Sequence, residues 1–168
     1  LKDKGIVEFV KAAEIVKRTR NHCEFQLLGF MDEKDKNGVT KKEMSDWIKD
    51  GAIKYLGVSN SVENHLAQAD CFVLPSFYKE GTPRSLLEAA SMGKPLITTD
   101  TPGCRNVLID NENGYFCKVK DADDLAQKMM KMVELPHDQI KKMGERSRRL
   151  IIEKFDVKLV IWEYLKRV

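Results

Sequence analysis

The apolar and polar residues follow two different periods along the chain, and this predicts short buried strands separated by amphipathic helices. Apolar residues recur at helical spacing over 6–19 and again over 121–135. Continuous apolar runs bounded by turn residues predict strands at 23–30, 52–57, 71–75, 95–99 and 112–119. Further helices are expected at 40–50, 61–69, 82–92, 137–155 and about 156–167, with a short one from about Arg105. This alternation predicts an α/β fold with a doubly wound parallel sheet of Rossmann-like type.

The stretch from Asp70 to Asp100 is the most informative part of the pattern. It reads as a strand, a polar loop, a helix and a second strand, and Thr82-Pro83 has the residue types of an N-cap followed by the first helical position. In an open parallel sheet, ligands bind beyond the carboxyl ends of the strands, where helix amino termini present free N–H groups. The residues predicted at this edge are Glu80, Gly81, Thr82, Arg84, Ser85 and, less than two turns into the helix, Glu88.

Composition narrows the classes of protein and site. The length of 168 residues suits one domain spanning 1–168, and 29 basic against 26 acidic residues give no reason to expect nucleic-acid binding. The four cysteines form no C-x-x-C pair and are expected to be reduced thiols, and the three scattered histidines predict no metal site. No apolar run reaches about 18 residues, so neither a membrane span nor a signal peptide is expected.

One motif carries a family resemblance. Glu80 and Glu88 are separated by seven residues, and Glu88 is followed by Ala-Ala-x-x-Gly-x-Pro-Leu-Ile. With FVLPS before it and TDTPG after it, this resembles the E-x7-E signature of glycosyltransferase family 4, retaining enzymes of GT-B type. The version EGTPRSLLEA resembles the branch of N-acetylhexosaminyltransferases of capsule and oligosaccharide synthesis. The resemblance covers only the C-terminal, donor-binding half of such an enzyme, and it predicts a domain without its first strand, whose sheet would be interrupted near the middle.

The resemblance also implies roles for individual residues. Glu80 would lie beside the transferred sugar as the catalytic residue, and Glu88 would hold the ribose hydroxyls of a UDP-sugar. Lys4, in a Lys-Gly pair, would contact the diphosphate, and main-chain groups near Gly57 and Val58 would hold the base. The remaining donor-binding residues would be those at the start of the helix: Gly81, Thr82, Arg84, Ser85 and Leu86. No metal and no cofactor is implied, because the UDP-sugar is itself the substrate.

Three features leave alternatives open. From its spacing alone, Glu88 is better interpreted as an exposed ion-pair partner of Arg84 at i,i+4, and the full motif reverses this preference. Pro83 removes a backbone donor where the family uses main-chain amides, so Arg84 and Ser85 are expected to contact the phosphates instead. The polar insert over 31–51 either folds over a ligand or only decorates the surface, and the second interpretation is preferred.

The expected function is therefore transfer of a hexosyl or N-acetylhexosaminyl group from a UDP-sugar to a saccharide or lipid-linked acceptor. The acceptor would be bound by an N-terminal domain of the same enzyme, and this chain alone would bind donor weakly and transfer nothing. The expected location is cytoplasmic, at the inner face of the membrane, with peripheral membrane contact by the basic C-terminal end left open. The rival functions are a nucleotide-sugar epimerase of GT-B type and a non-catalytic nucleotide-binding module.

Overall fold

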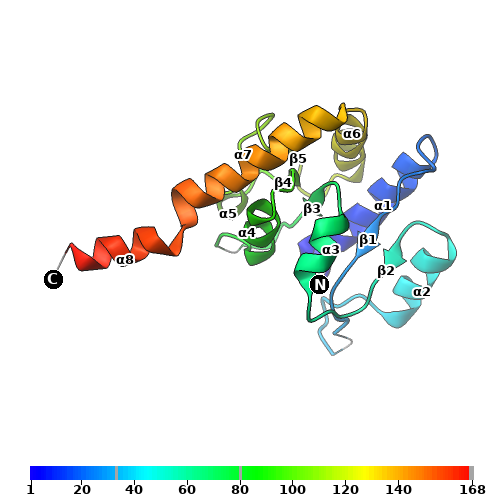
Figure 1. Ribbon diagram of the computed structural model, residues 1–168. Helices are drawn as coiled ribbons and strands as arrows, with labels where there is room; N and C mark the ends of the chain where they lie inside the picture. Colours follow the sequence, from blue (N-terminus) through cyan, green and yellow to red (C-terminus); the bar gives the residue numbers. More distant parts are fainter. Residues whose placement is uncertain (33, 80, 167–168) are drawn as a thin grey trace.

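The computed structural model describes residues 1–32, 34–79 and 81–166, and its helices and strands alternate along the chain (Figure 1). The helical elements are η1 (Lys2–Lys4), α1 (Ile6–Lys17), α2 (Lys41–Lys49), α3 (Val62–Gln68), α4 (Arg84–Ser91), α5 (Pro102–Arg105), α6 (Ala122–Val133), α7 (His137–Phe155) and α8 (Val157–Leu165). The strands are β1 (Gln26–Leu27), β2 (Lys54–Tyr55), β3 (Phe72–Leu74), β4 (Leu96–Thr99) and β5 (Gly114–Cys117).

All strand pairs between these elements are parallel, but they form two sheets and not one. β1 pairs with β2, while β3, β4 and β5 form a second sheet with β4 in the middle. Among the described strands, β1 and β3 are not paired with each other. The α/β class with parallel strands is confirmed, and the division into two sheets is the interruption that the sequence predicts. The strand expected at 112–119 corresponds to β5, which is the last strand of its sheet.

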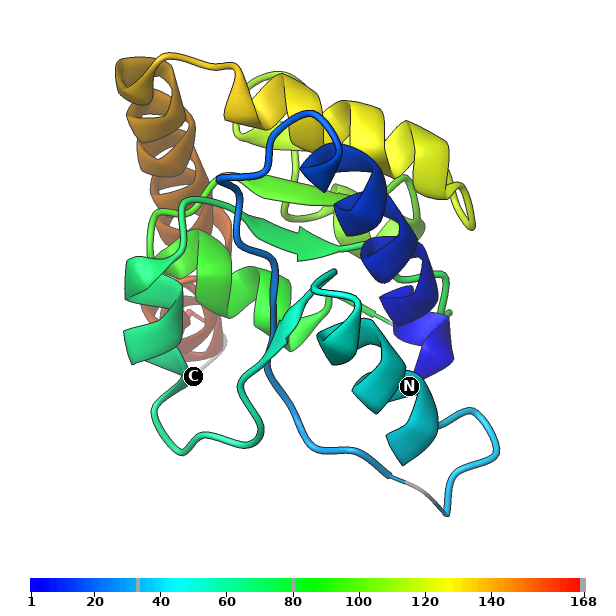
Figure 2. The same ribbon diagram turned by 90° about the vertical axis from the view of Figure 1, so that its right-hand side faces the viewer.

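Helices cover both faces of the three-stranded sheet, as a doubly wound fold requires (Figure 2). On one face, α1 and α6 pack together over Ile97 and Tyr115, with the buried residues Val10, Val16, Leu125 and Met129 between them. On the other face, α4 and α5 bury Leu86, Ala90, Cys104 and Val107 against Leu96. These apolar positions are the ones that the helical spacing of the sequence selects. Burial of both sheet faces explains why β4 is buried along its whole length.

The short helix after β4 begins earlier than expected. The sequence predicts a helix from about Arg105, and this is wrong, because α5 ends at that residue. Pro102 occupies the start of the helix, where a residue without an amide hydrogen costs no hydrogen bond, and Thr101 precedes it in an extended conformation.

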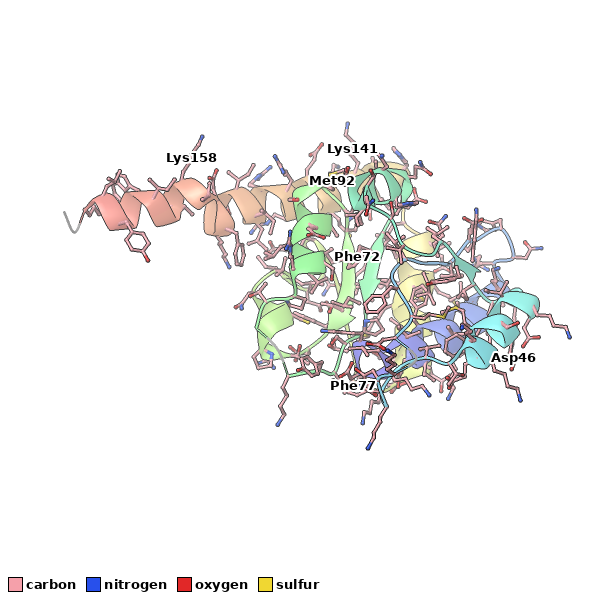
Figure 3. All side chains as sticks on the ribbon, turned by 90° about the horizontal axis from the view of Figure 1, so that it is seen from below. Asp46, Phe72, Phe77, Met92, Lys141 and Lys158 are labelled. Carbon is pink, nitrogen blue, oxygen red and sulfur yellow. The ribbon has the colours of Figure 1, made fainter. Side chains whose placement is uncertain are left out.

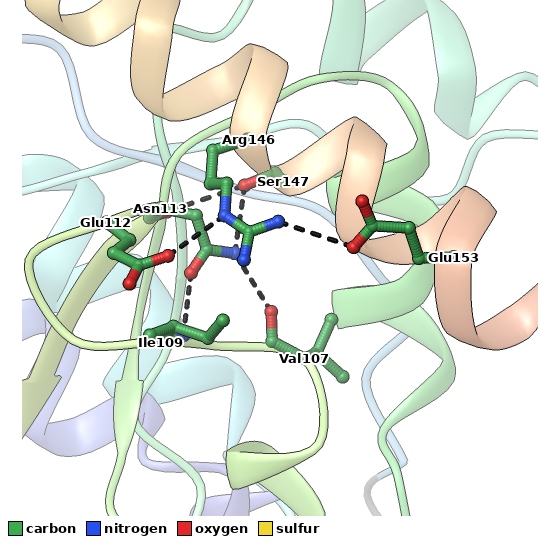
Figure 4. A network of polar contacts seen from close by, with 7 residues as sticks. All are labelled: Val107, Ile109, Glu112, Asn113, Arg146, Ser147 and Glu153. Atoms are coloured by element: carbon green, nitrogen blue, oxygen red, sulfur yellow. Dashed lines mark hydrogen bonds and ion pairs between the residues drawn. The ribbon is translucent and has the colours of Figure 1, made fainter.

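A buried polar network fastens α7 to the turn before β5 (Figure 4). The Asn113 side chain accepts a hydrogen bond of 2.7 Å from the Ile109 amide and donates to the Val107 carbonyl at 2.9 Å and to the Ser147 hydroxyl at 3.2 Å. At the surface, Arg146 pairs with Glu112 at 2.9 Å. Asn113 is fully buried, so its amide replaces water for backbone groups that no strand or helix satisfies.

The last helix departs from the rest of the molecule. α7 ends at Phe155. The next residue, Asp156, caps α8, because its carboxylate accepts a hydrogen bond from the Lys158 amide at 2.9 Å. α8 extends away from the sheets (Figure 1), and the Lys158 side chain points into solvent (Figure 3). Its apolar side chains are largely exposed, including Ile161, Trp162, Tyr164 and Leu165. None of the described helices combines the length and apolar character needed to cross a bilayer.

Candidate functional site

The first residues of the chain lie against the loop that follows β3. The Asp3 carbonyl accepts hydrogen bonds from the amides of Phe77 at 2.9 Å and Tyr78 at 3.2 Å. Gly5 has a positive φ of 77°, and a Cβ there would stand 2.1 Å from the Pro75 carbonyl oxygen. Glycine is therefore required where α1 begins, and the Lys-Gly pair sits at the carboxyl end of β3.

Lys4 lines a cavity beside this loop. Its Nζ lies 4.7 Å from the centre of the Tyr78 ring, and the cavity has a volume of about 310 Å³. The other lining residues are Leu1, Asp3, Asp35, Asn37 and Tyr78. None of the described lining residues belongs to α4, so the diphosphate contact expected for Lys4 stays a prediction.

The insert after β1 reaches the same cavity. Its residues Asp35 and Asn37 are part of the lining, and the Asn37 carbonyl accepts the Lys2 amide at 2.7 Å. The Lys2 ammonium also pairs with Glu43 on α2 at 2.7 Å and, with Thr40, lowers the pKa of that carboxyl to about 2. The preferred interpretation of the insert as surface decoration stays a prediction, because lining this cavity does not show that the insert folds over a ligand. Sequence patterns missed these contacts because they join segments more than 30 residues apart.

The amino end of α4 is one residue later than the sequence predicts. The N-cap is Pro83, with no side chain capping the helix, and Arg84 is the first helical residue. The amide of Leu86 donates to the Pro83 carbonyl at 3.1 Å. In the part of the chain that the structure describes, the amides of Arg84 and Ser85 meet no acceptor. Two N–H groups at the positive end of the helix dipole are thus available to an anion.

The charged side chains of α4 form an ion pair. Arg84 Nε lies 2.9 Å from Glu88 Oε1, and 92% of the Arg84 side chain and 42% of the Glu88 side chain are exposed. Both the ion pair and a ligand-binding role, which the sequence left open, remain compatible with this geometry. Glu80, the predicted catalytic residue, lies outside the described residues.

Not every predicted donor contact is open to a ligand. Leu86 is fully buried in the core, and its amide is already bonded within the first turn of the helix. The Leu86 side chain therefore packs α4 against the core. The amides without a described acceptor are those of Arg84 and Ser85. A donor contact through the Leu86 amide would compete with its hydrogen bond to the Pro83 carbonyl, and it stays a prediction.

The predicted base-binding residues lie after β2. The Gly57 carbonyl accepts the Gly29 amide at 2.8 Å, and the Tyr55 hydroxyl donates to the Gly29 carbonyl at 2.6 Å. These bonds bring together the loops that follow β1 and β2. Val58, the next residue, is 68% exposed. The main chain here is accessible, although no contact joins it to α4 among the described residues.

Residues after β4 complete this edge, and sequence reasoning did not select all of them. Asp100 pairs with Arg105 at 2.6 Å, and this hydrogen bond lowers the pKa of the Asp100 carboxyl. Asn106 Nδ2 donates to Thr82 Oγ1 at 2.8 Å and so connects α5 to the turn before α4. The predicted Thr82 cap of α4 is therefore wrong, because its hydroxyl is used in this contact. No short sequence pattern predicts the contact between Thr82 and Asn106, because the two residues are 24 positions apart.

The cysteines and acidic residues offer no metal centre. None of the four cysteines forms a disulfide, and burial raises the pKa of Cys71 and of Cys117 to about 12. These thiols are protonated at neutral pH and poor nucleophiles. Within the described residues, no group of three or more His, Cys, Asp or Glu side chains could hold a metal ion.

Comparison with known proteins decides the family. The model of the family "Glycosyl transferases group 1" matches residues 1–150. The chain belongs to this family. It is 35% identical over 131 residues to the N,N'-diacetylbacillosaminyl-diphospho-undecaprenol alpha-1,3-N-acetylgalactosaminyltransferase of Campylobacter jejuni, a match covering 78% of this chain and 32% of that protein. It is 33% identical over 104 residues to the UDP-Gal:alpha-D-GlcNAc-diphosphoundecaprenol alpha-1,3-galactosyltransferase of Escherichia coli, covering 61% of this chain and 26% of that one.

Solved structures show the same fold. The TarM protein of Staphylococcus aureus, determined with fondaparinux, alpha-GlcNAc-glycerol and UDP, superposes with a TM-score of 0.84 at 25% identity, covering 99% of this chain and 33% of that one. Anabaena HepE in complex with UDP gives a TM-score of 0.86 at 19% identity, covering 100% of this chain and 46% of that one. The predicted fold, the C-terminal domain of a GT-B glycosyltransferase, is confirmed by this agreement. The family member described here spans about a third of the length of the curated relatives that it matches.

Proposed function

We propose that this chain is the donor-binding domain of a retaining glycosyltransferase that takes a hexosyl or N-acetylhexosaminyl group from a UDP-sugar. The observation that carries the proposal is the amino end of α4, where the open amides of Arg84 and Ser85 stand beside Arg84 and Glu88 in a chain of this family. A diphosphate needs convergent N–H donors and a cation, and a ribose diol needs a carboxylate acceptor. Residues 1–168 would form this one domain.

The chemistry of donor cleavage assigns the groups their roles. As the bond from the sugar to the diphosphate breaks, negative charge develops on the departing phosphate oxygens. That charge is stabilised by the amides at the start of α4, the Arg84 guanidinium and the Lys4 ammonium. These groups lower the barrier because they are in place before the bond breaks. Glu88 fixes the ribose and hence the position of the diphosphate, while Glu80 lies beside the transferred sugar. The main chain at Gly57 and Val58 holds the base.

Binding of the acceptor would require the whole protein. Two relatives carry names that state acceptors linked to undecaprenyl diphosphate, so a lipid-linked saccharide is the acceptor class proposed here. An N-terminal domain of the same enzyme would bind it, since this chain spans only about a third of those relatives. The reaction would take place in the cytoplasm, at the inner face of the membrane.

Titration calorimetry on this chain tests the proposal. UDP, UDP-GalNAc, UDP-GlcNAc and UDP-Gal should bind, with ADP and GDP as matched controls that bind at least tenfold more weakly. Equal binding of all nucleoside diphosphates would overturn the assignment of the site. The isolated chain should show no transfer to an acceptor, and a mixture with its UDP-sugar should stay unchanged by NMR. Appearance of an epimerised sugar would favour the rival epimerase function.

The exposed apolar surface of α8 supports a peripheral membrane contact within this proposal. Trp162 and Tyr164 are aromatic residues of the kind that lie at lipid interfaces, and the Lys166 Nζ lies 3.1 Å from the centre of the Trp162 ring. Sedimentation with phosphatidylglycerol vesicles should pellet the chain, and Trp162→Glu should reduce the pelleted fraction severalfold. The control variant Lys141→Ala on α7 should behave as the unaltered chain. Equal pelleting of the Trp162 variant would contradict the contact.

A further inference from the structure

The turn that leads into α4 depends on a single described hydrogen bond. Gly81 has no hydrogen bond to any described residue, and the one bond of Thr82 is the 2.8 Å contact that its Oγ1 accepts from Asn106 Nδ2. The helix itself supplies nothing here, because its N-cap is Pro83 and no side chain caps it. The buried residues Leu86, Ala89 and Ala90 hold α4 against the core, and this contact is the described hydrogen bond that holds the turn before it.

Asn106, at the other end of the contact, is itself exposed but lies next to buried residues. Asn106 follows α5 and lies between Cys104 and Val107, which are 1% and 0% exposed. Its amide donates to the Cys104 carbonyl, and Cys104 in turn receives a hydrogen bond of 3.1 Å from the Thr98 hydroxyl in β4. Asn106 is thus linked to β4 through two hydrogen bonds, its own to the Cys104 carbonyl and that of Thr98 to the Cys104 side chain.

We propose that Asn106 is a positioning residue for the donor: its amide holds the Thr82 hydroxyl, and this fixes the turn that delivers the open amides of Arg84 and Ser85 to the diphosphate. The inference rests on the proposed function, because it assigns the diphosphate to the start of α4. It adds a residue that does not touch the donor. Asn106 acts through Thr82, so its loss would move the amides and leave their chemistry unchanged.

Binding of UDP to this chain, followed by amide NMR and calorimetry, tests the inference. Asn106→Ala should weaken UDP binding about fivefold, the loss that a hydrogen bond worth about 1 kcal/mol implies. Thr82→Val should have the same effect, and the double variant should be no weaker than either single one, since both remove one contact. Thr82→Ser keeps the hydroxyl that accepts from Asn106 and should bind UDP more tightly than Thr82→Val does.

Controls separate this role from simple loss of structure. The exposed Asn21→Ala, in the turn after α1, should leave UDP binding unchanged. The urea midpoint of Asn106→Ala should stay near that of the unaltered chain, while the resonances of the Arg84 and Ser85 amides should already differ without ligand. If the unaltered chain binds UDP and Asn106→Ala binds it equally well, the inference fails and the proposed function stands. If the unaltered chain binds no UDP, both the proposed function and this inference fail.

Discussion

Glu88→Ala is expected to lower the affinity of this chain for UDP about 100-fold, because a carboxylate that accepts both ribose hydroxyls loses two charged hydrogen bonds, each worth about 1.5 kcal/mol or more. The side chain is half-exposed at the start of α4, so its removal opens no cavity in the core. Calorimetry with UDP measures the effect directly. Glu145→Ala, an exposed glutamate on α7, is the matched control and should bind UDP normally.

A second comparison separates ligand binding from the ion pair. If Glu88 matters only as the partner of Arg84, then Arg84→Ala and Glu88→Ala should lower the affinity for UDP equally little, because an exposed ion pair contributes at most about 1 kcal/mol. Our account predicts a much larger loss of UDP affinity for Glu88→Ala. The free energy of unfolding of this variant should change by at most about 1 kcal/mol. Unaltered UDP affinity in Glu88→Ala would contradict the ribose-binding role.

Asn113→Ala is expected to lower the free energy of unfolding by about 3–4 kcal/mol, since it leaves a buried amide and a buried carbonyl without partners. The groups concerned are the Ile109 amide and the Val107 carbonyl, which the Asn113 side chain contacts at 2.7 and 2.9 Å (Figure 4). The loss should appear as a lower urea midpoint with an unchanged slope, provided that unfolding is two-state.

The neighbouring glutamate provides the control for this prediction. Glu112→Ala removes an ion pair with Arg146 whose glutamate side chain is 53% exposed, and it should change the unfolding free energy by less than about 1 kcal/mol. A similar small loss for Asn113→Ala would show that water replaces its amide, and would contradict the view that this network fastens α7 to the sheet.

The sequence predicted those features that depend on local spacing. The apolar stripes of α1 and α6 select residues that the structure buries between the two helices, and the helix expected at 40–50 is α2, which Thr40 caps. The family motif identified the fold and the helix that presents the candidate site. These predictions succeeded because each rests on residues within a few positions of one another.

Contacts between distant segments lay beyond the sequence patterns. The pattern places Asn113 only within the strand expected at 112–119, yet its side chain satisfies two backbone groups and reaches Ser147 on α7. Thr82 has the residue type of an N-cap, but the amide of Asn106 uses its hydroxyl. In both cases a local preference gave way to a tertiary hydrogen bond, which no periodicity records.

The most direct test of the central claim is an amide NMR titration of the ¹⁵N-labelled chain with UDP. The account places the diphosphate at the amino end of α4, on the side of β3 where Phe77 lies and opposite Met92 (Figure 3). The largest shifts should therefore fall on Arg84 and Ser85, with smaller ones near Lys4 and Gly57. Shifts confined to α6 and α7, with the start of α4 unchanged at saturating UDP, would contradict it.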